Sequence, residues 1–191
     1  MSDTTIFLDQ FTSEFVTGRI LKQQATYWDV QMLTGSDDSI WRISFSKKAE
    51  RQLPSSPFAS ASLKNNHPLL INYQEKWSSV AIYKSPQSNP DRIIKDINSI
   101  VLQQTLGYRS ANQYLSNVAT DVLTSGYGEL VGAPNSIISS LIPFVQQAGI
   151  LYTILVSGGP IHFIQHSEQF ALLLGNGYII APKIDVNKIR T

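Results

Sequence analysis

Residues 130–167 have the sequence LVGAPNSIISSLIPFVQQAGILYTILVSGGPIHFIQHS, which contains no Asp, Glu, Lys or Arg. Charged residues make up 15% of the whole chain, whereas roughly 25% is usual in soluble domains. Surface charge normally protects a soluble protein against self-association. We therefore expect part of the uncharged surface to be covered by another copy of the chain or by another protein.

Two interpretations of the secondary structure fit this stretch and the residues around it. The first is a β-α-β-α-β order, with elements over 127–131, 135–147, 150–156, 161–174 and 178–182, the third of them a buried strand. The second is an antiparallel β-meander with hairpin turns at Ser157–Pro160 and Gly175–Gly177, because Asn-Gly is a strong hairpin signal. Periodicity does not separate the two for such short runs. The first is preferred because Ser167-Glu168-Gln169 makes a poor turn but fits a helix.

The residues before this stretch predict a pair of helices. Asn89-Pro90-Asp91 supplies an N-cap, a proline at the first helical position and an acid in the first turn. The first helix is expected to reach about Thr105. The second runs from Ser110 to about Thr124, where Gly126 and Gly128 end it.

The N-terminal half predicts antiparallel hairpins. The expected elements are a helix over 3–24, a hairpin of strands 27–33 and 39–45, a loop over 47–68, and a hairpin of strands 69–73 and 77–84. Antiparallel strands followed by paired helices predict the α+β class.

Length and composition indicate one folded domain. The chain has 191 residues, and 42% of them are hydrophobic, which is enough to bury a core. We expect a single domain over 1–191, with a possible soft division near 108–126.

Composition also argues against several classes of function. The formal net charge is +1 and no cluster of Lys and Arg stands out, so no nucleic-acid partner is expected. The chain has no cysteine, which excludes disulfides, thiolate chemistry and Cys-based zinc sites. No cofactor motif is recognised, and none is predicted.

Nothing in the sequence predicts export or a membrane span. The N-terminus carries Asp3 and no basic residue before an apolar run, so no signal peptide is expected. The apolar run over 150–156 is far shorter than the ~20 residues that a spanning helix needs. The expected location is the cytoplasm or a macromolecular assembly.

Two loops of the C-terminal third are candidates for an anion site. In the β-α-β interpretation, a helix begins after each loop, and backbone N–H groups at a helix N-terminus can hold a phosphate. The candidate residues are Ser157, Gly158 and Gly159 in one loop and Asn135 and Ser136 in the other. Neither loop has the Walker lysine or the dinucleotide fingerprint, and a tight turn is the alternative interpretation.

His162 and His166 are four residues apart, a spacing that places two imidazoles on one face of a helix. A zinc site needs three or four ligands, and Glu168 would lie on another face. Two boundary histidines are the alternative, and His67 before Pro68 suits a turn better than a third ligand.

No catalytic set is predicted, because no G-x-S-x-G elbow or paired carboxylates in a plausible context occur. Large aromatic side chains are candidates for interface contacts, with burial in the core as the alternative. They are Trp28, Trp41, Trp77, Phe144, Tyr152 and Phe163.

The first functional hypothesis is a non-enzymatic assembly or adaptor protein, a subunit of a larger homo- or hetero-oligomer such as a virion, injection or secretion machine. Interface centres are poor in Lys, Glu and Asp and rich in aromatics, as is this chain. The alternative is a small-molecule or anion-binding α/β protein or enzyme that uses loops Gly132–Ser136 and Ser157–Pro160. A metal site at the two histidines is the third hypothesis.

Overall fold

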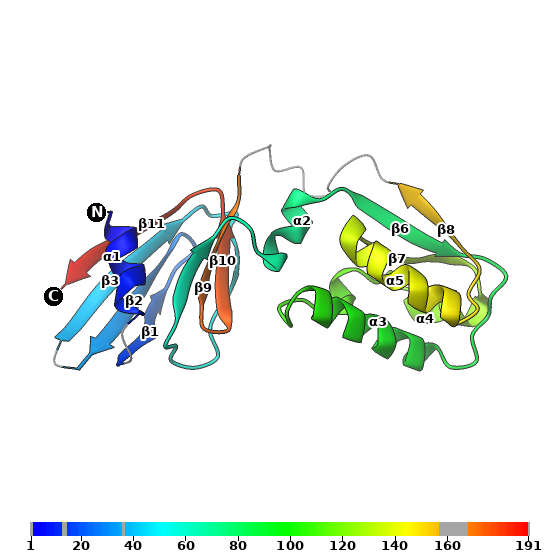
Figure 1. Cartoon of the computed structure of the whole chain (residues 1–191), viewed down its shortest axis with the longest axis horizontal. Coiled ribbons are helices and arrows are strands. Elements are labelled where there is room, and N and C mark those ends of the chain that lie inside the picture. Colours follow the sequence, from blue (N-terminus) through cyan, green and yellow to red (C-terminus); the bar gives the residue numbers. More distant parts are fainter. Residues whose placement is uncertain (1, 13–14, 36, 157–167, 191) are drawn as a thin grey trace. The chain divides into compact units, whose positions relative to one another are not determined.

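The fold is α+β, with antiparallel sheets and two groups of elements (Figure 1). The computed structural model describes residues 2–12, 15–35, 37–156 and 168–190. Contacts within the chain divide it into two compact units. Unit 1 lies within Met1–Leu70 and His166–Thr191, and unit 2 within Ile71–Gln165. These boundaries differ from the soft division expected near 108–126, and the grouping of both units into one domain stays a prediction.

Unit 1 contains two four-stranded antiparallel sheets. The first has the order β1 (Val16–Gln23), β2 (Tyr27–Thr34), β3 (Asp37–Phe45) and β11 (Ile184–Arg190). The second has the order β4 (Glu50–Gln52), β10 (Gly177–Ala181), β9 (Phe170–Leu174) and β5 (Ala61–Lys64). Helix α1 (Asp3–Gln10) and the 3₁₀ turn η1 (Pro68–Leu70) complete the unit.

Both sheets of unit 1 contribute to one apolar core. In β2 the buried apolar residues Trp28, Val30 and Met32 occupy alternate positions and so point to one face of the sheet. Val30 lies opposite the buried Trp41 of β3, so the two strands line the core together. Phe7 anchors α1 there, with its ring in edge contact with Trp41 at 5.5 Å between centroids.

Unit 2 combines one three-stranded sheet with helices. Its elements are α2 (Ile71–Gln74), β6 (Trp77–Ile82), α3 (Pro90–Gln104), η2 (Ala111–Gln113), α4 (Ala119–Ser125), β7 (Gly128–Pro134), α5 (Asn135–Gln147) and β8 (Tyr152–Val156). The strand order is β7-β6-β8, and both outer strands run antiparallel to β6. Because β6 separates β7 from β8, the connection through α5 crosses over one strand.

The sheet of unit 2 has a helix face and an open face. Val80 of β6 lies opposite Val131 of β7 and Ile154 of β8, so these side chains share the helix face. Val80 and Val131 are buried in a core that includes Ile97 of α3 and Leu141 of α5. The next position, Ser79, is on the open face and is only half-buried.

Several predicted elements agree with the structure. The hairpin of β2 and β3 is present, and Asn89 caps α3 by accepting a hydrogen bond from Arg92 N–H at 3.1 Å. Helix α5 has the predicted bounds. Gly126 closes α4 in the left-handed region, although the predicted helix over 110–124 is broken into η2 and α4.

Other predictions in the N-terminal half were wrong. The helix expected over 3–24 stops at Gln10, and β1 follows it, because Phe7 is the one buried residue of α1 and residues 16–23 pair with β2. The expected loop over 47–68 contains the short strands β4 and β5. Residues 69–73, expected as a strand, form η1 and α2, and the consecutive residues Leu69, Leu70 and Ile71 are all buried there.

The structure also separates the two interpretations of the C-terminal third. No parallel pair occurs among the described strands, and β9 and β10 form an antiparallel hairpin at Gly175 and Asn176, as in the meander. The predicted helix over 161–174 was wrong for the described residues 170–174, which form β9. Its remainder over 161–167 lies outside the described residues.

We expect Gly126→Ala to destabilise the protein more than Gly107→Ala. Both glycines have positive φ, +75° and +80°, so alanine costs roughly 1 kcal/mol of backbone strain at either position. At Gly126 a Cβ would also clash with the backbone nitrogen of Pro86, whereas at Gly107 it would meet nothing within 4 Å. The expected loss for Gly126→Ala is about 3 kcal/mol of unfolding free energy, measured by urea denaturation. Equal losses for the two variants would contradict this packing.

Candidate functional site

The outer strand β8 of unit 2 presents an open edge. The other outer strand, β7, is covered by residues 114–116, where Ser116 N–H donates to Leu130 O and Gly132 N–H to Tyr114 O, each at 2.9 Å. Strand β8 pairs with β6 on one side, through Ser78↔Val156 to Ile82↔Tyr152. Within the described ranges no segment pairs with its other side, here called the outer edge of β8.

The side chains around this edge are apolar and exposed. Exposed fractions are 50% for Leu151, 39% for Ile154, 50% for Leu155 and 74% for Val156. Tyr152 is half-buried against the core, and its hydroxyl accepts a hydrogen bond from Gln146 at the end of α5. Helix α5 packs over β6 and β7, which leaves Ile154 on the helix face without full cover. We call residues 151–156 the β8 patch.

The exposure of this segment was not predicted from the sequence. Residues 150–156 were expected to form a buried strand, and only Ile150 is buried, so that prediction was wrong for 151–156. The absence of alternating polar residues suggested burial on both faces. In an outer strand of a sheet, the same pattern instead produces an exposed apolar edge.

Charge distinguishes β8 from the other outer strands of the described sheets. The charged residues of those strands include Arg19 and Lys22 in β1, Asp185 and Lys188 in β11, Glu50 and Arg51 in β4, Lys64 in β5 and Glu129 in β7. Charged or proline residues at edges are a common protection against unwanted strand pairing. Strand β8, with sequence YTILV, has neither.

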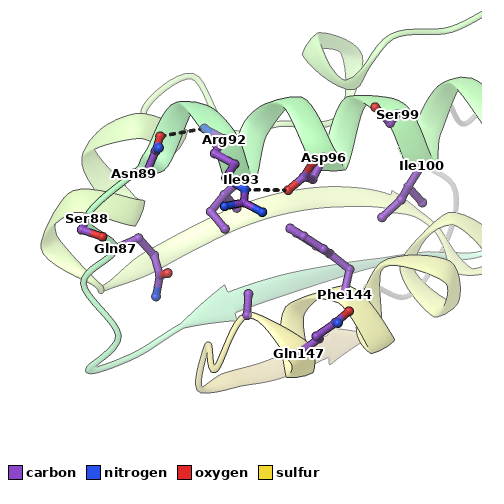
Figure 2. A pocket seen from close by; sticks show the side chains of 11 residues that line it. Gln87, Ser88, Asn89, Arg92, Ile93, Asp96, Ser99, Ile100, Phe144 and Gln147 are labelled. Carbon is purple, nitrogen blue, oxygen red and sulfur yellow. Dashed lines mark hydrogen bonds and ion pairs between the residues drawn. The ribbon is translucent and has the colours of Figure 1, made fainter.

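A second feature of unit 2 is a groove between α3 and α5 with a volume of about 670 Å³ (Figure 2). Ile93 and Ile100 of α3 and Phe144 of α5 form its apolar part, and Figure 2 shows Phe144 pointing toward α3. The rim is polar and includes Arg92 and Asp96, whose charged groups lie 4.0 Å apart. Its size lies in the range of small-molecule sites, about 300–1,000 Å³.

The predicted anion site is only partly described. Ser157, Gly158 and Gly159 lie outside the described residues. Asn135 and Ser136 begin α5, and their backbone N–H groups already have acceptors within the protein. Asn135 N–H donates to Lys76 O at 2.9 Å, and Ser136 N–H donates to a carboxylate oxygen of Glu75 at 2.8 Å. An external anion would therefore compete with Glu75 for the start of α5.

The predicted metal ligands His162 and His166 also lie outside the described residues. His67 forms a turn, in which its Nδ1 accepts a hydrogen bond from Leu69 N–H at 3.2 Å. Burial lowers the pKa of His67, and the positive charge of Lys64 lowers it further. Across the described part of the chain, no group of three or more His, Cys, Asp or Glu side chains could hold a metal ion.

The predicted aromatic residues separate into three groups. Trp28 and Trp41 are buried in the core of unit 1 and Trp77 in that of unit 2, and each exposes 6% or less of its surface. Phe144 lines the groove and Tyr152 belongs to the β8 patch. Phe163 lies outside the described residues.

Comparisons with known proteins found no relative of this chain. No protein-family model matches the chain, and no curated protein or solved structure matches it significantly. Among the helices of the described residues, none is long and apolar enough to cross a membrane.

We expect Glu75→Gln to lower the unfolding free energy by about 1 kcal/mol, because the carboxylate accepts from an N–H group at the positive end of α5. Glu129→Gln is the matched control, since Glu129 is an exposed acid on β7 of the same unit. Urea denaturation at neutral pH measures both. Identical stability of the two variants would mean that the Glu75 carboxylate does not stabilise the start of α5.

Proposed function

We propose that this protein is a non-enzymatic assembly or adaptor subunit that binds a strand of a protein partner along the outer edge of β8. The observation that carries the proposal is the β8 patch, an uncharged strand edge with exposed apolar side chains. The partner is a protein or another copy of the chain, and the protein acts in the cytoplasm or within the assembly itself.

The chemistry of a strand edge supports this function. An edge strand presents a row of backbone N–H and C=O groups that a partner strand can pair with. Strand addition combines these main-chain hydrogen bonds with contacts between alternate side chains. In the β8 patch, Ile154 and Leu155 supply such apolar contacts on opposite faces of the sheet.

The charge pattern supports the same function. Interface centres are depleted of Lys, Glu and Asp, because burying an unpaired charge is costly. The sequence has no charged residue between Glu129 and Glu168, a range that includes the whole β8 patch. Covering this patch would bury apolar surface without removing a charge of this chain from water.

A photo-crosslinking experiment tests the proposal. Leu155 is replaced by p-benzoylphenylalanine, and the full chain is expressed and irradiated in the cells that naturally make it. We expect a covalent adduct to a protein, because Leu155 would lie within the interface. The control carries the same substitution at Val118, which is 52% exposed in unit 2 but lies outside β8.

Mass spectrometry identifies the protein in any adduct. An adduct at Leu155 and none at Val118 supports strand binding at β8. No adduct at Leu155, or equal adducts at both positions, contradicts it.

The groove between α3 and α5 favours a second candidate function, small-molecule binding. Its apolar part and polar rim suit a ligand with an aromatic ring and a polar substituent. This site differs from the loops Gly132–Ser136 and Ser157–Pro160 suggested by sequence analysis. Gly132 lies within β7, and Ser136 donates to Glu75.

The dye 1-anilinonaphthalene-8-sulfonate is a suitable probe, used with a Leu155→Glu chain, because the added carboxylate repels the anionic dye from the β8 patch. We expect Ser99→Tyr to abolish most of the fluorescence increase, because Ser99 lines the groove. Thr124→Tyr on α4 is the control. The hydroxyls of Ser99 and Thr124 are both exposed, and each donates to the backbone carbonyl oxygen four residues earlier. Equal fluorescence of the two variants would count against the groove.

A further inference from the structure

We propose that the partner strand is β8 of a second copy of this chain, paired antiparallel so that Ile154 lies opposite Ile154 of the copy. This inference depends on the proposed function and specifies its partner. The resulting sheet would have the order β7-β6-β8-β8-β6-β7 across a two-fold axis.

The described extent of β8 favours one register. Its described residues are Tyr152–Val156, with Ile154 at their centre. A two-fold axis at Ile154 pairs all five of these residues, whereas any other antiparallel register leaves some of them unpaired. The axis places Tyr152 opposite Val156 and Thr153 opposite Leu155. Aromatic and β-branched residues are favourable partners across strands.

The faces of the two sheets also match. Directly opposite residues of an antiparallel pair point to the same face. Tyr152, Ile154 and Val156 alternate along the strand, and Ile154 lies on the helix face beside Val80. On that face, these three side chains would therefore contact the same three side chains of the copy. Ile154 and Val156, which the helices leave exposed, would gain apolar neighbours.

The lack of charge favours β8 of a second copy over a charged edge strand as the partner. The outer edge of β8 has no charge to pair with a charged partner strand, so burying such a strand there would cost desolvation energy. Among the described outer strands of this chain, β8 is the one without a charged residue. A second β8 is also closely matched in length and shape, as isologous contacts require.

The absence of cysteine makes the register directly testable. The chain contains none, so Ile154→Cys introduces a single thiol. In the proposed dimer this thiol lies opposite its own copy, within reach of a disulfide. Thr153→Cys is the matched control. Residue 153 would lie diagonally across from residue 153 of the copy, about 7–8 Å away, which is too far for an unstrained disulfide.

Both variants of the full chain are purified, checked for folding by circular dichroism and oxidised with copper phenanthroline. We expect a disulfide-linked dimer from Ile154→Cys at least about tenfold faster than from Thr153→Cys. The double variant Thr153→Cys/Leu155→Cys should recover rapid linkage, since residues 153 and 155 face each other. Equal rates for the two single variants overturn the register and therefore the proposal.

Light scattering of the cysteine-free protein gives an independent measurement. We expect twice the monomer mass of 21.2 kDa for the natural chain and for Val118→Lys, and the monomer mass for Leu155→Lys. A monomeric natural chain at high concentration overturns the inference. If Leu155 then still crosslinks to a different protein in cells, the proposed function holds. If it crosslinks to nothing, both fail.

Discussion

The pairing of β6 with two outer strands is the constraint on which the rest of unit 2 depends. Strand β6 bonds to β7 on one side and β8 on the other, and α5 has to cross over it to connect them. The helices pack over β6 and β7, and their apolar side chains close the core there. Strand β8 is held by its bonds to β6 but has little cover of its own.

This arrangement explains why residues 152–156 form a regular strand although most of their side chains are exposed. Hydrogen bonding to β6 keeps residues 152–156 extended, so the segment does not need a buried face to remain a strand. Its apolar side chains are then left partly in water, which is unfavourable by roughly 25 cal/mol for each Å². Among the described residues, no segment pairs with the outer edge of β8, whereas β7 is covered by residues 114–116.

The sequence predicted local features best where a few side chains determine the backbone. The Asn89 cap and Pro90 defined the start of α3, and the bounds of α5 were also predicted. Prediction failed where tertiary contacts decide between structures. Residues 170–174 follow either a helical or a strand pattern, and pairing with β10 and β5 makes them a strand.

The candidate site was predictable only in part. The missing charge between Glu129 and Glu168 predicted an interface in the third of the chain that contains the β8 patch, and Tyr152 was among the suggested residues. The sequence could not reveal that 151–156 lies at the edge of the sheet, because strand order depends on pairing between distant segments. The groove between α3 and α5 was missed for the same reason, since it forms from two helices separated in sequence.

Hydrogen–deuterium exchange of the backbone amides of β8, measured at several protein concentrations, tests the central claim most directly. Alternate amides of residues 152–156 face β6 and the others face outward. If the outer edge binds a second copy, the outward amides gain protection as concentration rises, while the amides of β6 stay equally protected throughout. Protection of the outward amides that is the same at every concentration would contradict the account.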